Sequence, residues 1–134
     1  MSDDRYERGT ALVAEIYGNV GSNVLGSLRD VAPDLARYVR EFAFGDIYSR
    51  PGLDLKSREI AIVASLVTLG TAKTELHAHL HGALNVGVTR EELVEVIMQM
   101  AVYAGFPVAI SGMRVLADVL KERGELTPAD SEAK

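Results

Sequence analysis

Apolar residues recur at helical spacing along most of this chain, and this periodicity limits the possible folds most strongly. In the segment 55–70, LKSREIAIVASLVTLG, apolar side chains point in nearly every direction from Ile60 onward. This pattern is typical of a helix that is buried on most sides. Asp54 is a suitable N-cap for that helix, and Gly70 a suitable C-terminal stop. We therefore expect a long, buried helix within an all-α fold.

The other segments also have helical signals and few strand signals. Pro33 and Pro107 suit the first turns of helices, and Thr89 with Glu92 forms a T-x-x-E capping box. The stretch 18–27, GNVGSNVLGS, is rich in glycine and is expected to interrupt the helices. We expect five or six helices and no strand, over the segments 5–17, 33–48, 55–69, 72–86, 90–104 and 107–124.

Length and charge exclude several classes of protein. The 134 residues suit one domain, 1–134, of which 127–134 is expected to be a disordered tail. The net charge of −5 and the lack of a basic tract argue against a nucleic-acid partner. No apolar run has transmembrane length and the N-terminus is polar, so we expect no membrane association and a cytoplasmic location. The mean hydropathy of +0.10 is high for a small domain and predicts a homo-oligomer that covers apolar surface.

The chain contains no cysteine. Disulfides, thiolate metal sites and thiol-based peroxidase cycles are therefore excluded for this chain. This is the firmest functional statement that composition alone supports.

All three histidines lie at alternate positions in TELHAHLHGAL, residues 74–84. On a strand, His77, His79 and His81 would share one face and could together bind a metal ion. The segment has almost no β-branched residues, however, and its leucines and alanine fall at i, i+4, i+7 and i+8. We therefore predict a helix, on which the three imidazoles point in different directions.

Each helical residue turns by about 100°, which predicts where each imidazole points. His79 leans toward the core or a cleft, His81 faces solvent or another subunit, and His77 lies at the border. Glu75 is one turn before His79 and could contact it. His77 and His81 could pair across one turn, but no third ligand is evident, so we expect no metal site. The alternative for His79 is a hydrogen-bonded core residue, and for Glu75 an exposed carboxylate at a helix start.

Several motifs, in order, resemble the carboxymuconolactone decarboxylase family over residues 5–120. They are the turn G-x-I-(aromatic)-x-R-P-G-L at 45–53, E-L-x-x-H at 75–79, G-V-T-x-E-E at 87–92 and Q-x-A-x-Y-x-G-x-P at 99–107. The resemblance implies an all-α, single-domain helical bundle of the alkylhydroperoxidase D-like type, assembled as a trimer or hexamer.

The resemblance also implies a branch of that superfamily. In alkylhydroperoxidase D a C-x-x-C motif precedes a histidine, and aligning that histidine with His79 places the cysteines at Ala72 and Glu75. The peroxidase branch is thus excluded. The implied activity is cofactor-free decarboxylation of 4-carboxymuconolactone to the β-ketoadipate enol-lactone in protocatechuate catabolism. Two departures from the family pattern bear on the substrate: His81 replaces a common Arg, and Tyr48 a common Trp.

The resemblance and the chemistry of the reaction together suggest roles for six residues. We expect His79 to donate a hydrogen bond or a proton, with Glu75 orienting it. Arg50 would bind a substrate carboxylate, and Arg58 is the competing candidate for that role. Arg50 could instead form an ion pair with Asp46 or Asp54.

Two further side chains, Tyr48 and His81, are predicted substrate contacts, and two other functions stay open. Tyr48 could donate a hydrogen bond, and His81 could reach the site of a neighbouring subunit. The first alternative function is a tailoring enzyme of the same fold that acts on another lactone or keto acid. The second is a non-catalytic oligomer that binds a small ligand.

Overall fold

The computed structural model describes residues 2–126, whose regular secondary structure is entirely helical, with no strand. The elements are α1 (Ser2–Tyr17), α2 (Asn19–Gly26), α3 (Pro33–Tyr38), η1 (Val39–Tyr48), α4 (Leu55–Leu69), α5 (Lys73–Asn85), α6 (Arg90–Tyr103) and α7 (Phe106–Glu122). The predicted all-α class is confirmed. The expected disordered tail, 127–134, lies outside the described residues.

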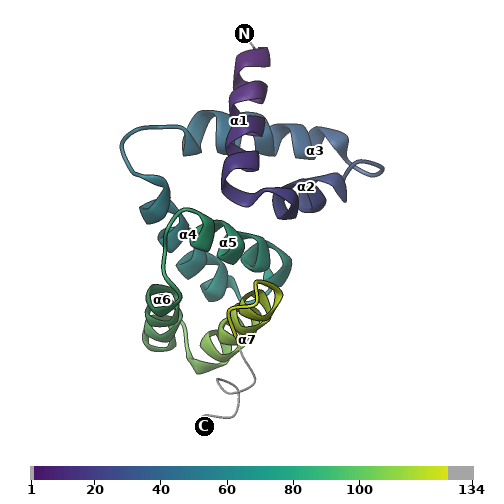
Figure 1. The fold of residues 1–134 in the computed structure, drawn as a ribbon. Helices are drawn as coiled ribbons and strands as arrows, with labels where there is room; N and C mark the ends of the chain where they lie inside the picture. The colour runs from purple at the N-terminus through teal and green to yellow at the C-terminus, as the bar shows by residue number, and fades with distance from the viewer. Residues whose placement is uncertain (1, 127–134) are drawn as a thin grey trace.

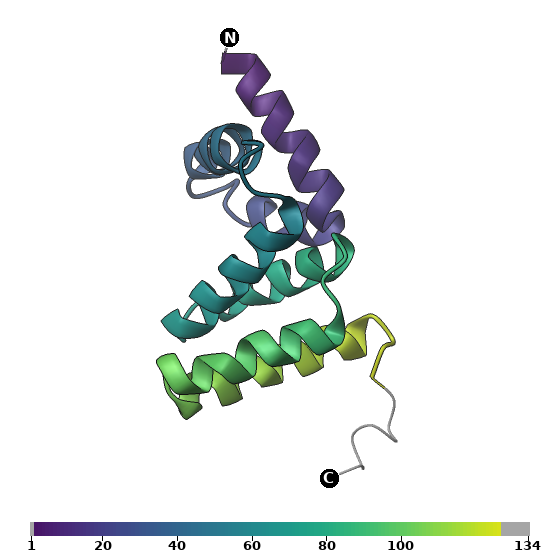
Figure 2. The same cartoon turned by 90° about the vertical axis from the view of Figure 1, so that its left-hand side faces the viewer.

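The helices form two groups that meet at α5 (Figures 1 and 2). The purple and blue elements α1, α2, α3 and η1 lie at one end of the molecule, and α4 to α7 lie at the other. The described part of the chain has no helix that is both long and apolar enough to span a bilayer.

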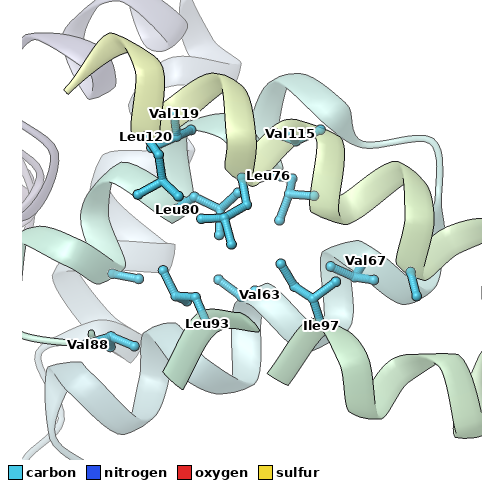
Figure 3. Close-up of a cluster of buried hydrophobic side chains, with 13 residues drawn as sticks. Val63, Val67, Leu76, Leu80, Val88, Leu93, Ile97, Val115, Val119 and Leu120 are labelled. Atoms are coloured by element: carbon cyan, nitrogen blue, oxygen red, sulfur yellow. The ribbon is translucent and has the colours of Figure 1, made fainter. Parts of the chain in front are cut away.

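Each group has its own hydrophobic core. The larger core lies between α4, α5, α6 and α7, where Leu80, Leu93 and Ile97 are fully buried (Figure 3). The smaller one joins α1 and α2 to α3 and η1 through residues such as Ile16 and Phe44. Val86, just after α5, packs against both cores. α5 therefore lies where the two groups of helices face each other.

The predicted helix ends are confirmed where a side chain defines them. Asp54 accepts a hydrogen bond from the Ser57 amide at 2.7 Å, and Gly70 ends α4 with a φ of 75°. Thr89 and Glu92 form the reciprocal capping box that opens α6. The residues 74–84 form a helix, as the periodicity predicted, and belong to α5.

The prediction that 18–27 interrupts the helices is wrong, because most of this stretch forms α2. Gly18, with a φ of 57°, provides the break, and the helix resumes at the next residue. A Cβ on Gly21 would lie 2.9 Å from atoms of both Val13 and Tyr17. Close packing on α1 therefore outweighs the poor helix propensity of glycine at this position.

The segment 33–48 also differs in detail from the single helix predicted. It begins as α3 with Pro33 in the first turn and continues from Val39 as the wider π-helix η1. η1 crosses α1 closely, since a Cβ on Gly9 would meet the Arg40 carbonyl oxygen at 1.7 Å. The helically spaced residues Leu35, Tyr38 and Phe42 are 51 to 59% exposed, so most of this stripe faces away from the core.

Candidate active site

A cavity of about 240 Å³ lies between the two groups of helices. The side chains that line it come from α1, α2, α3, η1 and the first turns of α5. They are Val13, Tyr17, Gly21, Val24, Leu25, Leu28, Leu35, Val39, Phe44, Glu75, Ala78 and His79. Its walls are thus apolar apart from Tyr17, Glu75 and His79. A cavity that is mostly apolar with a few convergent polar groups is the usual form of a small-molecule site.

His79 lies at the wall of this cavity, as its position on the helix predicted. Its side chain is 20% exposed. The ring nitrogen Nδ1 lies 3.0 Å from Oε2 of Glu59, so it donates a hydrogen bond to that carboxylate. The other nitrogen, Nε2, has no hydrogen-bond partner among residues 2–126. Nε2 is therefore free to contact a molecule bound in the cavity.

Glu59 supplies the carboxylate that orients His79. It lies on α4 and is fully buried, with an exposed fraction of 0%. A carboxylate without access to water needs several hydrogen bonds, and Glu59 has them from His79, Tyr17 and Tyr48. This arrangement fixes the orientation of the imidazole.

Tyr17 and Tyr48 complete the buried network. The Tyr17 hydroxyl donates a short hydrogen bond to Oε1 of Glu59 and lies 3.0 Å from Nδ1 of His79. Tyr48 donates to the same carboxylate oxygen at 3.3 Å. Burial, followed by the nearby Glu59 charge, raises the pKa of both phenols above the ordinary value. Both hydroxyls therefore stay protonated and act as hydrogen-bond donors.

Glu59 and Tyr17 were not among the site residues predicted from the sequence. Glu59 is spaced by four and eight residues from Val63 and Val67, the two buried valines of α4. A carboxylate on the core face of a helix was a detectable signal of a special environment. Tyr17 had no comparable signal, because an aromatic residue on an apolar face is more often a packing residue.

The predicted contact between Glu75 and His79 is absent. Nδ1 of His79 faces Glu59 and Tyr17 instead. Glu75 is exposed and lines the same cavity, in the first turn of α5. The expected orienting carboxylate thus comes from α4 rather than from the same helix.

The two predicted carboxylate-binding arginines do not line this cavity. Arg58 donates to the carbonyl oxygens of Leu53 at 3.0 Å and Arg50 at 2.9 Å, so it holds the 50–53 turn in shape. Arg50 lines a second, more open hollow of about 580 Å³, which Tyr48 and Arg8 also line. Within residues 2–126, Arg50 forms neither of the two predicted ion pairs. Asp46 pairs with Arg5 and Arg8 instead, and Asp54 accepts from the Ser57 amide at the start of α4.

His81 was predicted to face solvent or another subunit. It is instead buried within the chain, with an exposed fraction of 8%. The reason lies in the last turn of α7, which covers this side of α5. Nε2 of His81 is 3.3 Å from Glu122, and Nδ1 is 3.3 Å from the Arg123 guanidinium. Burial lowers the pKa of the His81 imidazole.

His77, one turn earlier, is intermediate in exposure, as predicted, and lies 2.6 Å from Glu122. Neither residue lines the His79 cavity.

Comparisons with known proteins place this arrangement in a family. The model of the carboxymuconolactone decarboxylase family matches residues 33–118. The chain is 36% identical to 4-carboxymuconolactone decarboxylase of Acinetobacter baylyi over 92% of its own length and 93% of the relative's. It is 37% identical to nitrosuccinic acid decarboxylase of Metarhizium robertsii, over 87% of this chain and 82% of that one. The matched segment includes Glu59 and His79, and the chain belongs to the carboxymuconolactone decarboxylase family.

Proposed function

We propose that this protein decarboxylates 4-carboxymuconolactone without a cofactor, giving the β-ketoadipate enol-lactone. The similarity to the Acinetobacter enzyme spans nearly the full length of both chains. The single observation that carries the proposal is the free Nε2 of His79 in an apolar cavity, backed by the buried carboxylate of Glu59.

The reaction breaks one carbon–carbon bond and moves one proton. As CO₂ leaves, the bonding electron pair spreads through the ring toward the lactone carbonyl oxygen. A proton must then be added to carbon to give the neutral enol-lactone. A donor aimed at the developing oxyanion is typically worth about 3–4 kcal/mol. Nε2–H of a protonated His79 can supply that hydrogen bond or the proton itself.

The surroundings of His79 suit this role in two ways. The carboxylate of Glu59 accepts the hydrogen bond from Nδ1 and so leaves Nε2 for the substrate. The apolar walls disfavour a compact carboxylate more than the delocalised anion that replaces it. Tyr17 joins Glu59 to His79, since its hydroxyl contacts both side chains. We assign Tyr17 and Tyr48 to positioning, because their hydroxyls are directed at Glu59.

We further propose that the protein is a homo-oligomer, a trimer or a hexamer as the resemblance implies. Leu35 lines the cavity and is also 51% exposed. Tyr38 and Phe42 continue this exposed stripe. A second copy packed on α3 and η1 would therefore bury the stripe and close the cavity mouth at the same time. Size-exclusion chromatography with light scattering tests this, and a monomer at micromolar concentration would contradict it. The cytoplasmic location stays a prediction.

A different carboxylic acid is the second candidate substrate. The relative from Metarhizium is named for nitrosuccinic acid, and its identity to this chain is similar, at 37%. Within the described residues, the His79 cavity has no arginine or lysine among its lining side chains. Nitrosuccinic acid carries two carboxylates, as 4-carboxymuconolactone does, so the lack of a cation does not separate these two acids. It would suit another lactone or keto acid that carries a single carboxylate.

The experiment is a direct assay of the purified protein without additives. We expect the absorbance of 4-carboxymuconolactone to fall with enzyme-dependent kinetics and CO₂ to be released in equal amount. Nitrosuccinic acid is assayed in parallel. Turnover of that acid alone would move the proposal to the second candidate. Turnover of neither acid, with a rise in Tm when either is added, would support a ligand-binding protein instead.

A further inference from the structure

A second cluster of chemically capable side chains lies on the other side of α5. His77 and His81 occupy successive turns of α5, and Glu122 reaches them from the last turn of α7. Their nearest ligand atoms all lie within 4.8 Å of one another. None of the three lines the His79 cavity, so the proposed decarboxylation does not explain this cluster.

The two imidazoles converge on one carboxylate oxygen. Nε2 of His77 lies 2.6 Å from Oε2 of Glu122, and Nε2 of His81 lies 3.3 Å from the same atom. The two ring centroids are 4.9 Å apart. Both imidazoles can thus hydrogen-bond to Glu122, and the same convergence of two nitrogens and one oxygen also matches a donor set that metal ions use.

We propose that His77, His81 and Glu122 bind a divalent transition metal ion of the zinc type. Two imidazoles and a carboxylate, with one position open to solvent, are a common three-ligand set for zinc. Around an ion with bonds of about 2.1 Å, ligand atoms lie roughly 3.4 Å apart in tetrahedral geometry. The His81–Glu122 distance already matches this, and the His77–Glu122 distance must widen. Glu122 can move outward, because its side chain is 52% exposed.

Arg123 opposes the metal ion. Its guanidinium donates to Nδ1 of His81 at 3.3 Å and to Oδ1 of Asn85 at 3.0 Å. Coordination through Nε2 requires the proton of a neutral imidazole to be on Nδ1, where the Arg123 donor now lies. Metal binding must therefore displace Arg123 from His81, and the arginine charge adds repulsion. This competition provides an internal test of which nitrogen binds.

The test is titration of tag-free protein with Zn²⁺ by isothermal calorimetry, with Co²⁺ as a spectroscopic probe. We expect one Zn²⁺ per chain, a tetrahedral cobalt absorption band and a rise in Tm with Zn²⁺, because the ion joins α5 to α7. His77→Ala, His81→Ala and Glu122→Gln should each weaken binding at least tenfold. Glu91→Gln, which removes an exposed carboxylate from α6, is the control for the negative charge that Glu122→Gln removes.

Two further variants sharpen the test. Arg123→Gln should tighten Zn²⁺ binding at least threefold, because it removes the competing donor and its charge. His79→Asn should leave the affinity unchanged, since its ring faces Glu59. His81 is buried, so circular dichroism must confirm that its alanine variant is folded, and the half-exposed His77 provides the variant that least disturbs packing. Absence of saturable Zn²⁺ binding, binding unaffected by His77→Ala, or no gain in Arg123→Gln would overturn the proposal.

Discussion

Glu59→Gln removes one charge from the centre of the buried network while keeping the shape of the side chain. The carboxylate lies 3.0 Å from Nδ1 of His79. Two unit charges at that distance attract by about 5–6 kcal/mol at an effective dielectric constant of about 20. A neutral amide oxygen can still accept the Nδ1–H hydrogen bond, which retains part of this stabilisation. We expect a net loss of about 3 kcal/mol in the interaction between residue 59 and a positive charge that forms on His79 during the reaction.

If protonated His79 acts in the rate-determining step, this loss lowers kcat about a hundredfold, since about 1.4 kcal/mol corresponds to one factor of ten. The KM should change much less, because Glu59 does not line the cavity. The assay measures kcat and KM for 4-carboxymuconolactone together with Tm. Glu95→Gln, which removes an exposed carboxylate from α6, is the matched control.

The variant also distinguishes catalysis from stability. Removing one partner of a buried, hydrogen-bonded charge pair typically costs several kcal/mol, so the Tm should fall, and circular dichroism must confirm that the variant is folded at the assay temperature. A Glu59→Gln protein with unchanged kcat would refute the reasoning, because the carboxylate would then serve packing alone. A variant that fails to fold would show that the network is mainly structural.

Two further predictions concern stability. Gly82→Ala should lower the free energy of unfolding by about 1–2 kcal/mol, because the new Cβ would lie 2.2 Å from Cε1 of Tyr17 and overpacking outweighs the gain in helix propensity. Urea unfolding measures this free energy. An unchanged value would mean that the Tyr17 ring moves aside freely. Asp46→Asn should destabilise the protein at pH 7 and progressively less below about pH 4. The reason is that the hydrogen bond from Arg5 lowers the pKa of Asp46 in the folded state. The stabilisation by the Asp46 carboxylate is therefore complete above the pKa of the unfolded state, and it is lost as the pH falls through the pKa of the folded state. Thermal melts of both proteins from pH 2 to 7 check this, and a difference in Tm that stays constant over that range would contradict it.

The fold was largely predictable because its signals are local. Caps such as Asp54 and the Thr89–Glu92 box depend on residues three apart, so the sequence alone reveals them. The inward lean of His79 follows from the helical turn in the same way. α2 was missed because glycine predicts a break, whereas the close approach of Gly21 to α1 is a tertiary effect.

The site was less predictable because it joins residues that are far apart in sequence. The partner of His79 is twenty positions away on α4, and the local alternative, Glu75, was the wrong choice. His81 was assigned to solvent or to another subunit because the helix pattern cannot reveal that α7 ends over it. The same contact brings in Glu122, the third donor whose absence had argued against a metal site.

The kcat of His79→Ala, measured beside its Tm and oligomeric size, tests the central claim most directly. We predict a loss of at least a hundredfold in the decarboxylation of 4-carboxymuconolactone, with the melting temperature and the assembly unchanged, because we propose that Nε2 contacts the substrate. A variant that retains wild-type kcat, or one that loses its fold along with its activity, would contradict a catalytic role for this imidazole.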